Sequence, residues 1–186
     1  MAVRIKSHWH NDESDRSMAD VGSALAFNAW RIAKDKAINL HGEDFVYADD
    51  RQRMGVIVEY LIFQVQVADR TAHQLLEMDD ETRRSLVVSF VKNLAQHLQD
   101  NSEDLFGPGD YGSAFIAQLN QRVNDYAEYN FTADGPSYPF YRHLGFEIQQ
   151  IMGKEGENRW VIDQVMDKDG PDVAKKMMRV LMDLTE

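Results

Sequence analysis

The stretch that decides the fold is VIVEYLIFQVQVADRTAH, residues 56–73. It is among the most apolar parts of the chain, but it also carries the polar side chains Glu59, Gln64, Gln66, Asp69, Arg70 and His73. When successive residues are placed about 100° apart, as in an α-helix, all of these except Gln64 share one narrow face. About 200° of the remaining surface is apolar, which predicts a helix that neighbours contact on two or three sides.

The polar face of this helix has two interpretations. A coherent polar face usually points to solvent, and that is the simpler prediction for these residues. The alternative is that the face lines an internal cavity of the protein. Glu59 and His73 are fourteen positions apart. That spacing is about 21 Å along a helix axis, so these two side chains cannot bind the same metal ion.

The rest of the chain repeats the helical pattern between short clusters of Gly and Pro. Ser17 and Asp79 stand where helix N-caps are expected. Pro139 and Pro171 suit the first turn of a helix, where the backbone N–H has no intrahelical partner. The expected helices cover residues 17–42, 51–77, 81–100, 113–131, 138–152, 157–167 and 171–184. The sequence therefore predicts an all-α fold.

The predicted fold is a single-domain helical bundle of five principal helices plus one or two short C-terminal helices. The chain of 186 residues is long enough to bury one sizeable core without disulfides or metals. The helical domain is expected to span residues 16–186. Residues 1–15 are polar and are predicted to be a disordered tail.

Composition excludes several classes of protein. The chain has no cysteine, which excludes a disulfide scaffold, a thiolate zinc site, an iron–sulfur cluster and a catalytic thiol. There is neither an apolar signal segment nor a run of about 18 apolar residues, so a cytoplasmic location is expected. The formal charge of −11 repels nucleic acid and anionic membranes. A partner with a basic face, or a cationic or metal ligand, fits this charge better.

Two pairs of residues have the spacing of metal ligands. Asp69 and His73 are four residues apart on one helix, and His143 and Glu147 have the same spacing on another. If the two helices were neighbours, the four side chains would form a set able to bind iron, manganese or zinc. The alternative is that both are ordinary solvated pairs, because neither Glu-x-x-His nor His-Glu-x-x-His occurs. The default expectation is no cofactor.

Aromatic residues are concentrated between residues 126 and 146, on both sides of a Gly-Pro turn. They can pack under the turn as part of the core, or form a ligand pocket or a docking surface for a partner. The candidates for such a surface are Tyr138, Phe140, Tyr141 and Arg142, with His143 as a further polar group.

Two functional hypotheses follow. The first is a non-enzymatic protein that acts by protein–protein interaction, with a homodimer through the second and third helices as one form. The second is a small metal- or ligand-binding protein, which could be a metalloenzyme, using the two His/carboxylate pairs. No nucleophile motif of the G-x-S-x-G type occurs, so no catalytic residue is predicted and enzymatic activity stays open.

Overall fold

The computed structural model describes residues 17–42 and 45–186, so the predicted tail, residues 1–15, lies outside it. The predicted all-α bundle is confirmed. Its helices are α1 Met18–Gly42, α2 Asp50–Gln74, α3 Asp80–Phe106, α4 Tyr111–Ala127, α5 Tyr138–Met152, α6 Val161–Gln164 and α7 Gly170–Thr185. Between α4 and α5, strands β1 Phe131–Thr132 and β2 Gly135–Pro136 pair antiparallel. The sequence does not predict this hairpin, because two residues per strand show no alternation.

Capping residues fix where the longer helices begin. The Ser17 hydroxyl accepts a hydrogen bond from the Asp20 backbone N–H at 3.2 Å. The carboxylates of Asp49 and Asp79 accept from the first turns of α2 and α3 in the same way. These bonds satisfy N–H groups that have no intrahelical partner. Helices α1, α2 and α3 therefore begin within one residue of their predicted starts. Helix α5 begins at its predicted start without a side-chain cap, with Pro139 in its first turn.

The predicted ends of α3 and α4 are wrong. Helix α3 continues past residue 100 to Phe106 and stops at Gly107, whose φ of 84° is one that residues with a Cβ rarely adopt. Helix α4 was expected to reach residue 131 but ends at Ala127. The reason is that Phe131 leaves the helix and is buried as part of the hairpin.

The C-terminal segment differs most from expectation. The two short helices expected at residues 157–167 and 171–184 are instead a 3₁₀ turn, Gly156–Trp160, followed by a continuous helical path to Thr185. That path contains one π-turn, Val165–Asp169, in which the Gly170 N–H donates to the carbonyl of Val165. Pro171, which has no N–H to donate, follows this turn directly and stands in the first turn of α7.

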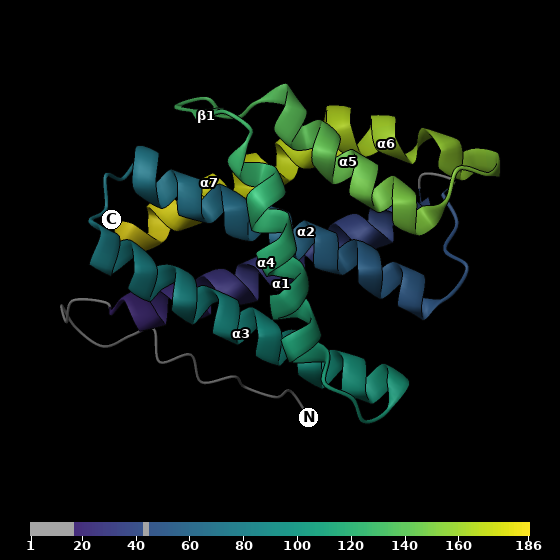
Figure 1. The fold of residues 1–186 in the computed structure, drawn as a ribbon, viewed down its shortest axis with the longest axis horizontal. Helices are drawn as coiled ribbons and strands as arrows, with labels where there is room; N and C mark the ends of the chain where they lie inside the picture. The colour runs from purple at the N-terminus through teal and green to yellow at the C-terminus, as the bar shows by residue number, and fades with distance from the viewer. Residues whose placement is uncertain (1–16, 43–44) are drawn as a thin grey trace, which may run out of the picture.

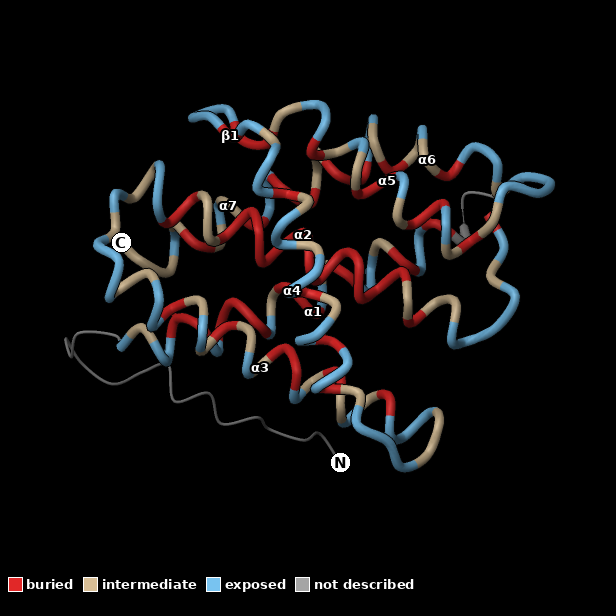
Figure 2. The backbone as a smooth tube through the Cα atoms, viewed as in Figure 1, coloured by how far each residue is buried: buried red, intermediate tan, exposed pale blue. Residues whose placement is uncertain are grey.

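Helix α2 is the centre of the bundle. It contacts α1, α3, α4, α5 and α7, and Figure 1 shows α4 crossing in front of the other helices while α1 and α7 lie behind. Every residue from 56 to 68 is buried, as the tube in Figure 2 shows for the middle of the molecule. The predicted enclosure of this helix on several sides is confirmed. All the helices share one hydrophobic core.

Small residues let α1 approach its neighbours closely. A Cβ on Gly22 would lie 2.6 Å from the Cβ of Ser89 on α3, which is a clash. The Ser89 hydroxyl donates to the carbonyl of Ala19 at 2.8 Å, so the two helices touch almost backbone to backbone. On the side toward α2, the buried Gln64 amide donates to the carbonyl of Ala29 at 3.0 Å. These bonds fix α1 against both α3 and α2.

None of the described helices combines the length and the apolar character that crossing a lipid bilayer requires.

Candidate functional site

The polar face of α2 divides into a buried half and an exposed half. Glu59 is fully buried and Gln66 is 6% exposed. Toward the C-terminal end, Asp69 and Arg70 are half-buried and His73 is exposed. The simpler prediction, that the whole face points to solvent, is therefore wrong for its first half. The reason is that α4 crosses α2 and covers this half of the face.

Charged side chains of three helices meet beneath α4. The Glu59 carboxylate accepts hydrogen bonds from Gln118 Nε2 at 2.6 Å and from Arg122 Nη2 at 2.8 Å, both on α4. The same guanidinium nitrogen donates to Glu147 Oε2 on α5 at 2.6 Å. We call Glu59, Gln118, Arg122 and Glu147 the α4 charge cluster. It places one buried carboxylate against a guanidinium, which is the arrangement that a desolvated charge needs.

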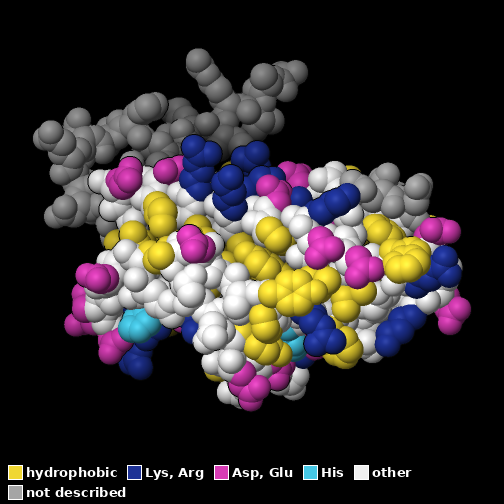
Figure 3. Space-filling view, turned by 90° about the horizontal axis from the view of Figure 1, so that it is seen from above, with side chains coloured by type: hydrophobic (Ala, Val, Ile, Leu, Met, Phe, Trp, Pro, Cys, Tyr) yellow, Lys and Arg dark blue, Asp and Glu magenta, His cyan; other side chains and the backbone are white. Residues whose placement is uncertain are grey.

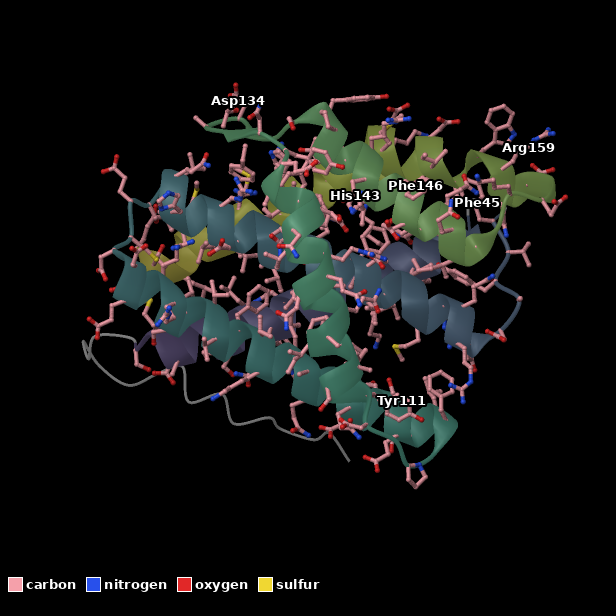
Figure 4. All side chains as sticks on the ribbon, in the orientation of Figure 1. Phe45, Tyr111, Asp134, His143, Phe146 and Arg159 are labelled. Atoms are coloured by element: carbon pink, nitrogen blue, oxygen red, sulfur yellow. The ribbon has the colours of Figure 1, made fainter. Side chains whose placement is uncertain are left out.

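His143 lies at the edge of this cluster, on α5 beside α4 (Figure 4). Its Nε2 is 3.7 Å from the Asp125 carboxylate and 3.9 Å from that of Glu147. Both separations are too long for a hydrogen bond, and this buried nitrogen has no hydrogen-bond partner among the described residues. The ring packs edge to face on Tyr126, with 4.8 Å between centroids. Burial lowers the pKa of His143, while the Asp125 carboxylate opposes the shift.

The four predicted metal ligands do not form one site. The Asp69 carboxylate pairs with Arg83 of α3 at 2.9 Å, and His73 is exposed. His143 and Glu147 do lie together, but the Glu147 carboxylate already binds a cation, the Arg122 guanidinium. Within the described part of the chain, no three His, Asp or Glu side chains are grouped as a metal site requires. The condition for a shared metal site, that Asp69, His73, His143 and Glu147 come together, is therefore not met among the described residues.

A second buried charge sits at the π-turn. The Asp169 carboxylate, 5% exposed as a residue, lies 3.3 Å from Lys36 Nζ on α1 and accepts from the Tyr60 hydroxyl at 3.4 Å. Lys36 also pairs with Asp172 of α7 at 2.7 Å. Burial raises the pKa of the Asp169 carboxyl, against the opposing effect of the Lys36 ammonium. This cluster ties α1, α2 and α7 together.

The aromatic candidates separate into core and surface residues. Phe140 is fully buried, and its ring is tilted against that of Tyr126 with 4.6 Å between centroids, so it belongs to the core. Tyr141 is half-buried, and its ring centroid lies 6.1 Å from that of Phe63 on α2. Tyr138 and Arg142 are exposed. The structure thus leaves two of the four predicted interface candidates on the surface and places Phe140 out of a partner's reach.

The surface residues belong to a wider apolar face on α5 and the turn that follows it. Tyr138, Phe146 and Trp160 are 59%, 47% and 53% exposed. Figure 3 shows hydrophobic side chains gathered across this face, and Figure 4 shows Phe146 and Arg159 projecting from it. Gly145 allows α6 to approach α5, because a Cβ there would lie 3.0 Å from the Ile162 carbonyl. We call Tyr138, Phe146 and Trp160 the α5 aromatic face.

Sequence reasoning missed Arg122, Lys36 and Asp169. Arg122 had a usable signal: it is the one Lys or Arg within residues 111–127, and Glu59 in an apolar helix requires a cation. Lys36 and Asp169 had none, since each stands among other charged residues of its own segment. Their pairing follows from the π-turn, which periodicity does not reveal.

Comparisons with protein-family models, with curated proteins and with solved structures give no significant match to this chain.

Proposed function

We propose that this chain acts by docking another protein on the α5 aromatic face. The observation that supports the proposal is the exposure of Tyr138 and Phe146 on α5 and of Trp160 on the 3₁₀ turn that follows it. Tyr and Trp residues with Arg at their side are the composition of binding hot spots. Here Arg159 lies over the Trp160 ring, with Cζ 5.1 Å from its centroid, and Arg142 is exposed one turn from Tyr138.

The charge of the chain favours a partner with basic groups around its binding surface. The formal charge of −11 draws such a partner toward the protein and repels a second copy of the same chain. A complex with a basic partner and a homodimer should depend on salt in opposite ways. Added salt weakens a complex with a basic partner, because it screens attraction, and strengthens a homodimer, because it screens repulsion.

The homodimer surface expected from sequence, on helices two and three, has little support. The apolar residues of α2 between 56 and 68 are buried within the single chain, so α2 offers no apolar area to a second copy. Helix α3 exposes two large apolar residues, Val88 at 46% and Leu105 at 49%, which stand seventeen positions apart, about 25 Å along the helix. Among the described elements, the α5 aromatic face is the better docking surface.

Site-specific photo-crosslinking tests the proposal. A photoreactive phenylalanine analogue is introduced at Phe146 and, as a matched control, at Val88, and each protein is irradiated in extract of the producing cells. We expect a defined adduct from position 146 that disappears with Trp160→Ser. Val88 should give no such adduct. The same adduct from both positions, or none from position 146, would contradict docking at this face.

The identity of the adduct separates the two kinds of partner. Sedimentation of the purified protein at tens of micromolar, in low and high salt, reports self-association directly. A monomer in both conditions, together with a heterologous adduct that weakens as salt rises, is the expected result. A dimer that strengthens with salt and is lost in Phe146→Ser would show that the partner is a second copy of the chain and not a basic protein. Phe146→Ser and Trp160→Ser should keep the wild-type circular dichroism spectrum, since both side chains are half exposed.

A further inference from the structure

Helices α1 and α7 line a groove of about 520 Å³. Its lining is Asn28, Arg31, Ile32, Asp35, Lys36, Ile38 and Asn39 of α1 with Lys176, Arg179 and Val180 of α7. We call this the α1–α7 groove. Its volume is within the range of sites that hold small organic ligands. It shares no residue with the α5 aromatic face or with the α4 charge cluster.

The lining is basic although the chain is strongly acidic. The lining holds four cations, Arg31, Lys36, Lys176 and Arg179, and one carboxylate, Asp35, in a protein whose formal charge is −11. Two further carboxylates, Asp169 and Asp172, pair with the lysines from behind the lining. Figure 3 shows Lys and Arg side chains gathered at one edge of an otherwise mixed surface. Such a local reversal of sign keeps an anion in the groove while the rest of the surface repels it. Charge alone therefore favours an anionic ligand.

The two lysines are held in place from behind. Lys36 Nζ lies 3.3 Å from Asp169 and 2.7 Å from Asp172, and its side chain is 12% exposed. Lys176 pairs with the same Asp172 at 2.8 Å, so this carboxylate bridges the two ammonium groups. An ammonium group has three N–H donors. Lys36 uses two of them on carboxylates.

The two arginines carry the charge that is not neutralised. Neither Arg31 nor Arg179 lies within salt-bridge distance of a carboxylate among the described residues, and Arg31 stands 5.8 Å from the Phe27 ring. They belong to different helices, so they approach the groove from its two walls. A guanidinium offers a planar pair of N–H donors that matches the oxygens of a phosphate.

From these observations we propose that the α1–α7 groove binds a small organic phosphate, with Arg31 and Arg179 on its phosphate group. A phosphate monoester carries nearly two negative charges at neutral pH, so its charge matches that of two guanidinium groups. A carboxylate carries one negative charge and matches only one guanidinium. The apolar part of the lining, Ile32, Ile38 and Val180, then contacts the organic part of the ligand. This site is independent of the proposed protein docking.

Calorimetric titration at constant ionic strength tests the site with three probes: phenyl phosphate, inorganic phosphate and benzoate. We expect saturable binding of phenyl phosphate, tighter than inorganic phosphate because of the apolar wall and tighter than benzoate because of the second charge. Arg31→Gln and Arg179→Gln should each weaken phenyl phosphate about tenfold, the loss of one charge-assisted interaction. Asp35→Asn should strengthen it.

Matched controls come from the same two helices. Lys34 on α1 and Lys175 on α7 are exposed and do not line the groove, so Lys34→Gln and Lys175→Gln remove the same charge outside it. These variants should keep wild-type affinity. Equal weakening by the controls would reduce the effect to the general field of the protein and overturn the site. Equal affinity for benzoate, or no saturable binding of phenyl phosphate at millimolar concentration, would overturn it as well.

Discussion

A buried carboxylate in the middle of an apolar helix is stable only where a cation reaches it. Glu59 meets this condition through Arg122, and Arg122 in turn meets Glu147, so the α4 charge cluster is a chain of alternating charges. Such a pair adds little net stability over apolar side chains of the same shape, but removing one member leaves an unpaired buried charge. The residues of this cluster that a sequence can reveal are therefore those that require a partner of opposite charge.

Removing Arg122 should be far more costly than its partial exposure suggests. Arg122→Leu leaves the fully buried Glu59 without its cation, and we expect a loss of about 3–5 kcal/mol in the free energy of unfolding by urea. The double variant Glu59→Leu with Arg122→Leu should recover most of that loss. Arg84→Leu, at an exposed arginine on α3, should change stability by about 0.5 kcal/mol or less. If Arg122→Leu alone were as stable as the wild type, the buried Glu59 carboxylate would not depend on Arg122.

His143 should make stability fall as the solution becomes acidic. Its pKa in the folded protein is lowered from 6.5 by burial, so below pH 6.5 the unfolded chain binds a proton more readily than the folded chain. The free energy of unfolding is then highest above pH 6.5 and declines as pH falls toward the lowered value. Urea denaturation between about pH 7 and pH 5 should show a weaker slope for His143→Gln. His73→Gln, at an exposed histidine, is the control and should keep the wild-type slope.

At the scale of elements, local chemistry predicts starts and distant contacts decide ends. Ser17, Asp49 and Asp79 identify three helix starts, because an N-cap acts within one turn of itself. The end of α4 depends on where Phe131 finds the core, and the π-turn depends on the helices it packs against. Neither is contained in the periodicity of a short window. The central position of α2 was predictable because its apolar surface is wider than one neighbour covers.

Two glycines on helices should respond in opposite directions to the same substitution. Gly22→Ala places a Cβ 2.6 Å from the Cβ of Ser89 and 2.8 Å from the Phe90 backbone nitrogen, so α1 and α3 must separate. We expect a loss of about 1–3 kcal/mol. Gly55→Ala on α2 meets only Ile151 at 3.4 Å and should gain about 0.5–1 kcal/mol from helix propensity. Thermal or urea unfolding compares the two, and a Gly22→Ala variant at least as stable as the wild type would refute the close packing of α1 on α3.

At the scale of the whole molecule, charge is distributed unevenly. The formal charge of −11 is spread over the chain, whereas the cations of the α1–α7 groove are concentrated at one place. The two buried clusters hold opposite charges in contact and are little affected by salt, since screening acts mainly between exposed groups. The surface carboxylates repel one another through solvent, and this repulsion opposes the compact state.

Moderate salt should therefore stabilise the protein. Raising sodium chloride from about 20 mM to about 200 mM shortens the screening length to near 10 Å or less, so the melting temperature should rise. A variant with three exposed carboxylates neutralised, Asp104→Asn, Glu128→Gln and Glu157→Gln, should start higher at low salt and rise less. A melting temperature that falls with salt would mean that attractive pairs outweigh the repulsion.

The π-turn at Val165–Asp169 holds one residue more than a regular helical turn would. Because five residues of a π-turn rotate the chain about as far as four residues of an α-helix, deleting one residue here would restore a regular helix and leave α7 in nearly the same orientation. The buried side of α7, formed by Val173, Ala174, Met177 and Leu181, would then keep its place in the core. A one-residue deletion at this turn should therefore be tolerated better than one within the regular turns of α7, where it would rotate these side chains by about 100°.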